Sequence, residues 1–143
     1  AVQLAERLLK RLPSNQSKVF YSDNGSTAVE VGLKMAFQYW SNLGEPRTRV
    51  IALENAYHGD TFGGMSVGAR NAFNLPFSKL LFEVITIPVP VKGQEQQSLN
   101  ALKEALKQGP VAAFIVEPLT KYNVSWLRAA HWSPTTQGPE DDK

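Results

Sequence analysis

Apolar residues recur along several segments of the chain at the spacing of helices. This spacing covers residues 27–43 and 98–108, where apolar side chains return every three or four positions. Residues 1–12 show the same pattern, with leucines on one face, and Pro13 ends it. Residues 59–66 are predicted to form a short helix or a turn. These segments are the expected helices of the fold.

Shorter apolar runs separate the expected helices and predict strands. They cover residues 18–22, 49–54, 84–87 and 111–116. The last run is continuously apolar, which is typical of a strand whose two faces are both covered. Because strands alternate with helices, we expect an α/β fold with a mainly parallel sheet and flanking helices.

The expected domain organisation follows from length and from a change in composition. A chain of 143 residues is expected to form one domain at most. Residues 1–119 carry the alternating pattern, whereas residues 120–143 are polar and rich in turn-forming residues. We therefore expect a partial α/β domain at 1–119 and a disordered tail at 120–143.

Composition narrows the class of protein. Apolar residues make up 43% of the chain and charged residues 20%, as in an ordinary globular protein. The net charge of +2 is small and the basic residues do not cluster, so neither nucleic acid nor a membrane is an expected partner. With no cysteine, and with His58 and His131 as the two histidines, no metal site is expected. No apolar run reaches the roughly 20 residues of a membrane span, and we expect a cytoplasmic protein.

The turn at Gly25, Ser26 and Thr27 could bind a phosphate group. It lies between a predicted strand and a predicted helix, and the N–H groups at a helix N-terminus attract anions. Gly25 lets the backbone approach closely, and the hydroxyl groups of Ser26 and Thr27 can donate hydrogen bonds to phosphate oxygens. The alternative is a plain helix cap, in which Thr27 and Glu30 form a capping box and nothing binds.

Tyr57, His58 and Gly59 follow a predicted strand, at the sheet edge where α/β proteins bind ligands. Tyr57 has a flat ring that could stack on a planar cofactor, and Gly59 permits close backbone approach. The alternative is a core tyrosine beside a solvated histidine. Asp60 could recognise an amine substrate or, alternatively, could cap the short helix that follows it.

Glu117 ends the last predicted strand, immediately before Pro118. A carboxylate there points toward the same edge of the sheet as Tyr57 and could hold a hydrogen bond near a cofactor ring. The alternative is an exposed acid in a loop. It is the combination of these segments, more than any one of them, that is specific.

Three segments together resemble the class III aminotransferases of fold type I. Residues 23–40 are similar to the phosphate-binding turn and helix of that family, residues 55–67 to its ring-stacking segment, and residues 114–118 to its strand ending in Glu-Pro. They occur in the family's order and at a plausible spacing. The resemblance covers about residues 1–119 and implies pyridoxal 5′-phosphate as the cofactor.

The resemblance also implies roles for the matching residues. The implied cofactor-binding residues are Gly25, Ser26, Thr27, Tyr57, His58, Gly59 and Glu117. Among them, Gly25 and Ser26 would hold the phosphate, and Tyr57 would stack on the pyridine ring. Glu117 would join the hydrogen bonds beside the ring, and Tyr57 and Asp60 would lie at the substrate end.

Within the family, one branch is most similar. Asp60-Thr61 after His-Gly, and residues 38–40, resemble the branch that moves an amino group from S-adenosylmethionine to 8-amino-7-oxononanoate in biotin biosynthesis. The resemblance implies a homodimer that acts on small molecules. Three alternatives stay open: another class III aminotransferase acting on an ω-amine substrate, a non-catalytic truncated product, and a binder of a different phosphate ligand.

The segment after Glu117 departs from the family pattern. In the family, Glu-Pro is followed by a glycine-rich loop, then by the aspartate that pairs with the pyridinium nitrogen and by the Schiff-base lysine. Residues 120–123 do not resemble that loop, and neither Lys121 nor Lys143 matches that lysine. We therefore expect no catalytic residue in this chain, and we expect the isolated polypeptide to be inactive.

Overall fold

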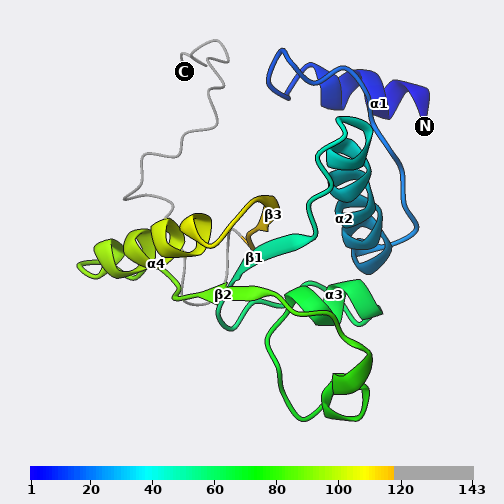
Figure 1. Cartoon of the computed structure of the whole chain (residues 1–143). Coiled ribbons are helices and arrows are strands. Elements are labelled where there is room, and N and C mark those ends of the chain that lie inside the picture. Colours follow the sequence, from blue (N-terminus) through cyan, green and yellow to red (C-terminus); the bar gives the residue numbers. More distant parts are fainter. Residues whose placement is uncertain (118–143) are drawn as a thin grey trace.

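The computed structural model describes residues 1–117 of the chain, and Figure 1 shows their arrangement. The helices and strands follow in the order α1 (Val2–Leu9), α2 (Gly25–Asn42), β1 (Arg49–Leu53), α3 (Phe62–Val67), the 3₁₀ helix η1 (Leu75–Leu80), β2 (Ile85–Ile87), α4 (Glu95–Lys107) and β3 (Val111–Ile115). Among the helices of residues 1–117, none is long and apolar enough to cross a membrane. The expected tail at 120–143, with its boundary at 119, lies outside the described residues and stays a prediction.

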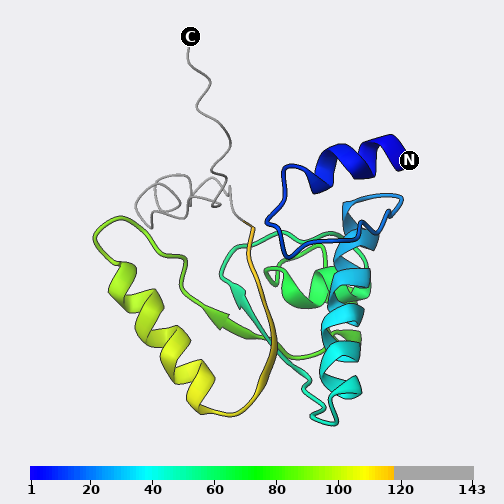
Figure 2. The same ribbon diagram turned by 90° about the horizontal axis from the view of Figure 1, so that it is seen from above.

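The strands form a parallel sheet in the order β2-β1-β3. β1 lies in the middle, with Ile51 opposite Ile85 on one side and opposite Phe114 on the other. Figures 1 and 2 show α4 on one face of this sheet and α2 with α3 on the other. The predicted α/β fold with a parallel sheet and flanking helices is confirmed. Because the strands are parallel, their carboxyl ends share one edge of the sheet.

Both faces of the central strand are buried, because successive side chains of a strand point to opposite faces. The buried side chains between the sheet and α4 are Ile51, Leu53, Ile87 and Ala105. Those between the sheet and the pair α2 and α3 are Leu33, Val50 and Val67. The two layers fix the position of β1, and with it the loop that leaves its carboxyl end.

The strand predicted at residues 18–22 is wrong. The segment has no regular structure, and no strand within residues 1–117 pairs with it. Phe20 and Tyr21 are 65% and 46% exposed, and the Tyr21 hydroxyl donates to the Ala1 carbonyl oxygen at 2.6 Å. Aromatic and β-branched residues favour a strand only where a neighbouring strand and a buried face are available, and this segment has neither.

Helices α2 and α4 begin earlier than the apolar pattern predicts. α2 starts at Gly25, and α4 starts at Glu95 rather than at Ser98. The first residues of both helices are polar or are glycine, so the apolar repeat does not extend over them. The apolar repeat of α4 is only partly buried: Leu102 packs against the core, whereas Leu99 and Leu106 are 49% and 53% exposed.

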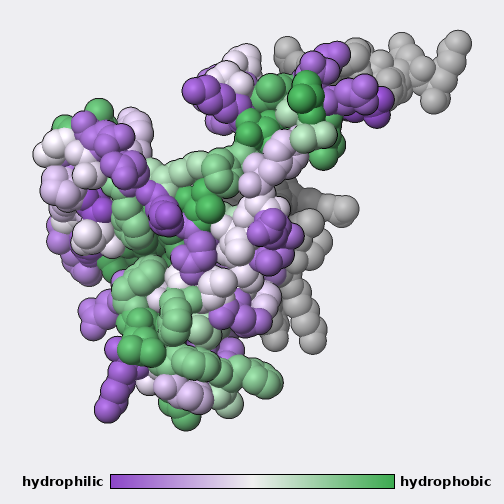
Figure 3. Space-filling model, turned by 90° about the vertical axis from the view of Figure 1, so that its right-hand side faces the viewer, coloured by the Kyte–Doolittle hydropathy of each residue, from purple (hydrophilic) through white to green (hydrophobic). Residues whose placement is uncertain are grey.

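Large apolar side chains remain exposed in the segment that follows α3. Figure 3 shows hydrophobic surface in the lower half of that view, the level at which Figure 1 places α3 and this segment. Phe73 is 90% exposed, and Leu75 and Leu80 are each 68% exposed. A group of exposed apolar residues is typical of a surface that makes further contacts.

Candidate functional site

Asn24, and not Thr27, is the N-cap of α2, so the predicted capping box of Thr27 and Glu30 is wrong. The Asn24 side-chain oxygen accepts the Thr27 N–H at 3.0 Å, and the Thr27 hydroxyl oxygen accepts the Asn24 N–H at 3.2 Å. Asn24 has the extended backbone that an N-cap requires, whereas Thr27 already lies in the helix. The Ser22 hydroxyl donates to the Thr27 hydroxyl oxygen at 2.6 Å, so the cap and its neighbour engage this hydroxyl group.

The first two amides of α2 have no acceptor among the described residues. The Asn24 carbonyl oxygen accepts the N–H of Ala28 at 3.0 Å, and the cap uses the N–H of Thr27. Within residues 1–117, no acceptor pairs with the N–H groups of Gly25 and Ser26. No atom lies within 4 Å of the position that a Cβ atom would take at Gly25. Because the first turn also lacks an acidic residue, it offers these N–H donors and the positive end of the helix dipole to an anion.

Tyr57, His58 and Gly59 line the same cavity as the start of α2. This cavity has a volume of about 400 Å³, and Gly25 and Ser26 form its other wall. Tyr57 is 63% exposed and His58 is 8% exposed, the reverse of the alternative of a core tyrosine and a solvated histidine. The Tyr57 ring is therefore accessible to a ligand, whereas His58 belongs to the interior.

Close packing holds the loop after β1 against α2. Gly59 has a φ of +104°, a left-handed conformation that favours glycine. A Cβ atom at Gly59 would overlap the side chain of Ser26. The Asp60 N–H donates to the Ser26 hydroxyl oxygen at 3.4 Å. Ser26 is therefore shared between the first turn of α2 and the contact with this loop.

Asp60 contacts Tyr57 instead of capping the following helix. Its carboxylate accepts the Tyr57 hydroxyl at 2.8 Å, and Thr61 is the N-cap of α3, so the alternative of a cap at Asp60 is wrong. The hydrogen bond to Asp60 is the main cause that raises the pKa of Tyr57, with desolvation and the Asp60 charge acting in the same direction. The phenol keeps its proton at neutral pH, and the carboxylate beside it could attract an ammonium group.

Glu117 joins the end of β3 to the loop after β1. Its carboxylate accepts the N–H of Tyr57 at 3.0 Å, so it is not the simple exposed loop acid of the alternative interpretation. Burial lowers the pKa of His58, and the charge of Glu117 opposes this shift. In the part of the chain that the structure describes, the buried Nε2 atom of His58 has no hydrogen-bond partner. The imidazole is therefore neutral at pH 7.

The structure brings the predicted site residues together at the carboxyl edge of the sheet. Those that line the cavity are Gly25, Ser26, Tyr57, His58 and Gly59. Asp60 and Glu117 adjoin it through their hydrogen bonds to Tyr57, whereas Thr27 serves the cap. None of the lining residues is a lysine. Among residues 1–117, no group of three or more histidine, cysteine or acidic side chains is placed to hold a metal ion.

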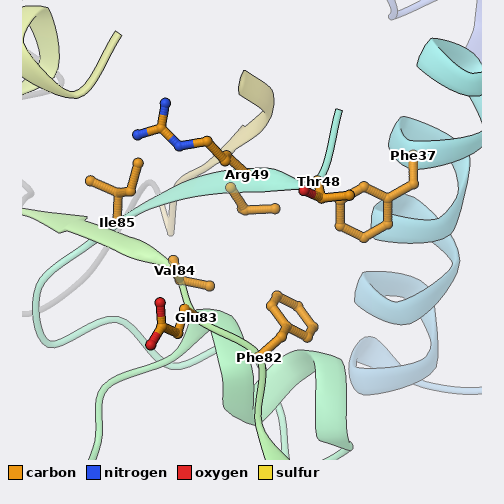
Figure 4. Close-up of a pocket in the computed structure, with 8 residues that line it drawn as sticks. Phe37, Thr48, Arg49, Phe82, Glu83, Val84 and Ile85 are labelled. Carbon is orange, nitrogen blue, oxygen red and sulfur yellow. The ribbon is translucent and has the colours of Figure 1, made fainter. Parts of the chain in front are cut away.

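A larger cavity lies at the opposite edge of the sheet (Figure 4). It has a volume of about 560 Å³ and is lined by residues at the amino ends of β1 and β2, among them Arg49 and Ile85. Figure 4 shows Phe37 and Phe82 facing the same space, and their rings meet edge to face with 6.5 Å between centroids. Open α/β sheets bind ligands at the carboxyl ends of their strands, so the cavity beside α2 is the candidate site.

Comparison with known proteins identifies the family. The model of the class III aminotransferase family matches residues 1–121. The chain belongs to the class III aminotransferases. This aminotransferase chain is 54% identical over 129 residues to the adenosylmethionine-8-amino-7-oxononanoate aminotransferase of Synechococcus elongatus, a match that covers 85% of the chain and 30% of the relative. The enzyme of the same name from Geobacter sulfurreducens is 44% identical over 135 residues, with the same coverage of 85% and 30%. The chain spans about 30% of the length of these curated relatives.

Solved aminotransferase structures share the fold. The adenosylmethionine-8-amino-7-oxononanoate aminotransferase of Methanocaldococcus jannaschii matches with a TM-score of 0.70 and 36% identity, over 79% of this chain and 26% of that one. An amine transaminase from an uncultivated Pseudomonas species, in its pyridoxal-phosphate-bound form, matches with a TM-score of 0.72 and 33% identity, over 83% of this chain and 30% of that one. The predicted fold type I architecture is confirmed.

Two contacts that support the site differ from the sequence-based predictions. The Asn24 cap had a local signal, because asparagine directly before a helix is a preferred N-cap. The contact of Glu30 had no local sequence signal, because its carboxylate accepts the N–H of Gly63, 33 positions further along the chain. Sequence spacing alone suggested that Glu30 would act within its own helix.

Proposed function

We propose that the whole protein is a pyridoxal-phosphate-dependent aminotransferase that transfers an amino group from S-adenosylmethionine to 8-amino-7-oxononanoate. The product would be 7,8-diaminononanoate, within biotin biosynthesis. The observation that carries this proposal is the 54% identity over 129 residues to the Synechococcus elongatus enzyme of that name. The geometry of the cavity beside α2 supports the cofactor.

The residues of this cavity fit the parts of pyridoxal phosphate. The open N–H groups of Gly25 and Ser26 suit its phosphate, and the space beside the Gly25 Cα atom leaves room for phosphate oxygens. Tyr57 presents an exposed ring at the same cavity, which suits stacking on a planar pyridine. Glu117 fixes the backbone of the residue that carries this ring.

Pyridoxal phosphate, when bound, supplies an electron sink that stabilises negative charge on the carbon that carries the amine. The residues of this chain would bind and orient it. Gly25 and Ser26 would hold the phosphate at the positive end of α2, and Tyr57 would set the plane of the ring. Asp60 would attract the cationic amine of the donor and keep the Tyr57 hydroxyl protonated.

A second candidate is transfer from an ω-amine donor. The observation in its favour is the match to the Pseudomonas amine transaminase, at 33% identity and a TM-score of 0.72. The full-length gene product separates the two reactions when it is assayed with S-adenosylmethionine and 8-amino-7-oxononanoate, and in parallel with an ω-amine donor. Formation of 7,8-diaminononanoate supports the first candidate, and turnover of the ω-amine alone supports the second.

We further propose that the whole protein is a cytoplasmic homodimer acting on small molecules. The dimer is supported by the family resemblance and by the exposed apolar side chains after α3, among them Phe73 and Leu75. The cytoplasmic location is supported by composition, since the sequence has no apolar run of membrane-spanning length.

Binding of pyridoxal phosphate to the chain, followed by tryptophan fluorescence, tests the cofactor proposal. Tyr57→Ala is expected to weaken binding about tenfold, because a stacked aromatic ring contributes about 1–3 kcal/mol to binding a planar base. Tyr39→Ala is the matched control, since Tyr39 is an exposed tyrosine on α2 at 58% exposure and lines neither wall of the cavity. Equal affinity of both variants and the original chain would argue for a different ligand.

Absence of turnover by the isolated chain stays a prediction. The measurement is an assay of the 143-residue polypeptide with both substrates and pyridoxal phosphate. Borohydride reduction of the same mixture gives an independent readout. Turnover, or cofactor trapped on one specific lysine, would contradict the prediction.

A further inference from the structure

The carboxylate of Glu30 links helix α2 to the start of α3. Its Oε1 atom accepts the N–H of Gly63 at 2.5 Å and the N–H of Gly64 at 3.3 Å. Thr61, the N-cap of α3, makes no capping hydrogen bond with its side chain. Its hydroxyl group is buried and has no partner among residues 1–117. Glu30 therefore provides from another helix the cap that Thr61 does not provide, through charge-assisted hydrogen bonds.

Packing around these two glycines is tight. A Cβ atom at Gly63 would lie 2.5 Å from a carboxylate oxygen of Glu30. A Cβ atom at Gly64 would lie 2.8 Å from the carbonyl oxygen of His58 and 2.9 Å from that of Gly59. The start of α3 is thus held between the Glu30 side chain and the backbone of the loop that carries the site.

Glu30 follows Ser26 by four residues, so both side chains lie on one face of α2, one turn apart. Ser26 contacts Gly59 and accepts the N–H of Asp60 at 3.4 Å. Glu30 accepts hydrogen bonds from the same stretch of chain a few residues later, at the start of α3. The hydrogen bond from Asp60 to Ser26 is long and weak, whereas the Glu30 hydrogen bonds carry a charge, so Glu30 makes the stronger polar contact of the two.

We propose that Glu30 is a positioning residue of the cofactor site. By holding Gly63 and Gly64, its carboxylate fixes the segment from Tyr57 to Asp60 against the first turn of α2. The ring that contacts the cofactor and the amides that bind its phosphate belong to elements far apart in sequence, and Glu30 sets their relative position. As far as it concerns the cofactor, this inference rests on the proposed function.

The test compares Glu30→Ala with Glu30→Gln, which keeps an acceptor oxygen at the same place. The control is Glu104→Gln, because Glu104 is an exposed carboxylate on α4 whose one ion pair among residues 1–117 is with Lys107, at 2.7 Å. Two readouts are measured under conditions in which circular dichroism shows each variant folded. They are the affinity for pyridoxal phosphate and the pKa of the Tyr57 hydroxyl, followed by ultraviolet absorbance against a Tyr57→Phe reference.

Glu30→Ala is expected to weaken pyridoxal phosphate binding about tenfold, the loss typical of a hydrogen bond to a charged group. It is also expected to return the pKa of Tyr57 toward its ordinary value, because that pKa is raised by the contact with Asp60. Glu30→Gln is expected to restore most of both properties, and Glu104→Gln to change neither.

Gly63→Ala probes the same contact from the other side. Its methyl group would displace the Glu30 carboxylate, so it is expected to weaken cofactor binding in the original chain. In the Glu30→Ala background the same substitution meets no carboxylate, so its effect is expected to shrink. Additive effects of the two substitutions would contradict direct coupling.

A folded Glu30→Ala variant with unchanged cofactor affinity and an unchanged Tyr57 pKa would overturn the proposal and leave Glu30 as a helix cap. The Tyr57 titration needs no ligand, so the two proposals fail separately. If the original chain does not bind pyridoxal phosphate, the cofactor proposal fails. The positioning role is then judged by the Tyr57 pKa of the three variants.

Discussion

Helices α2 and α4 differ in what the chain provides for the backbone N–H groups of their first turns. α2 begins with a side-chain cap at Asn24 and has no acidic residue in its first turn, and among residues 1–117 the amides of Gly25 and Ser26 have no acceptor. α4 follows Gln94, whose side chain makes no capping hydrogen bond, and begins at Glu95. The α4 helix thus places its own carboxylate where α2 leaves room for an external anion.

The electrostatics of the first turn of α4 follow from this carboxylate. Glu95 accepts its own backbone N–H and the N–H of Gly93, the latter at 2.9 Å, and these hydrogen bonds lower its pKa. Every helix N-terminus attracts negative charge, but only one that the chain leaves unsatisfied can bind a ligand. The comparison supports the proposed anion site at α2 for a reason beyond the presence of a glycine.

Alanine substitution of a left-handed glycine near each helix tests the part played by packing. Gly59 and Gly93 have φ angles of +104° and +85°. A Cβ atom at Gly93 would have no neighbour within 4 Å, whereas one at Gly59 would overlap Ser26. We expect Gly93→Ala to lower the free energy of unfolding by about 1–2 kcal/mol, from backbone strain alone, and Gly59→Ala by about 2–5 kcal/mol.

Urea unfolding followed by circular dichroism measures both Gly59→Ala and Gly93→Ala. Equal losses would show that the contact between Gly59 and Ser26 contributes nothing to stability. The loop after β1 would then not be held against α2 by packing at that point.

Giving α2 the acidic start of α4 tests the anion site directly. Gly25→Glu places a carboxylate at the first helical position, where α4 has Glu95, and no atom within 4 Å obstructs it. We expect the affinity for pyridoxal phosphate to fall at least about 100-fold, because like charges a few ångströms apart repel by several kcal/mol near a protein surface. Stability is expected to stay the same or rise.

Gly32→Glu is the matched control for this substitution. Gly32 is an exposed position within the same helix, and a side chain there would have no neighbour within 4 Å. The charge change is identical, so an equal loss of affinity in both variants would assign the effect to overall charge and not to the first turn of α2.

The sequence predicted the elements of the site better than the contacts between them. The apolar runs located the sheet strands, although burial on both faces holds only for the central strand β1, and Phe114 of β3 is exposed. It failed at residues 18–22, because strand formation depends on a partner that local composition does not reveal. Motif resemblance predicted Tyr57 and Gly25 to belong to one site, and both line the cavity beside α2.

The contacts that join the site were hidden because they link distant segments. Glu30 looked like a partner of Thr27 at capping-box spacing, but its carboxylate reaches Gly63 in another helix. Likewise, Tyr57 and His58 are neighbours in sequence with opposite exposure, 63% and 8%. Which of the two faces solvent depends on the packing of α2 and β3 around the loop, and no local pattern encodes it.

The smallest expected effect concerns the pH dependence of the folding stability that Glu95 contributes at the start of α4. Hydrogen bonds from its own backbone N–H and from Gly93 lower the pKa of Glu95 in the folded protein. A carboxyl group with a lower pKa in the folded than in the unfolded state stabilises the fold above its unfolded pKa, and this contribution is lost as the pH falls through the folded pKa. Glu95→Gln should therefore reduce stability at neutral pH slightly and flatten its decline in acid.

Unfolding measured from neutral to acidic pH, with carboxyl titration by nuclear magnetic resonance, checks this expectation for Glu95. Glu104→Gln serves as the control, because its carboxylate lies in the body of α4, near the carboxyl end, where no free amides are available. If Glu95 titrates at its ordinary pKa, its carboxylate does not satisfy the first turn of α4. The difference between the starts of α2 and α4 would then rest on the space beside Gly25 and not on charge. Binding of phosphate ions should in that case be measured at both helices.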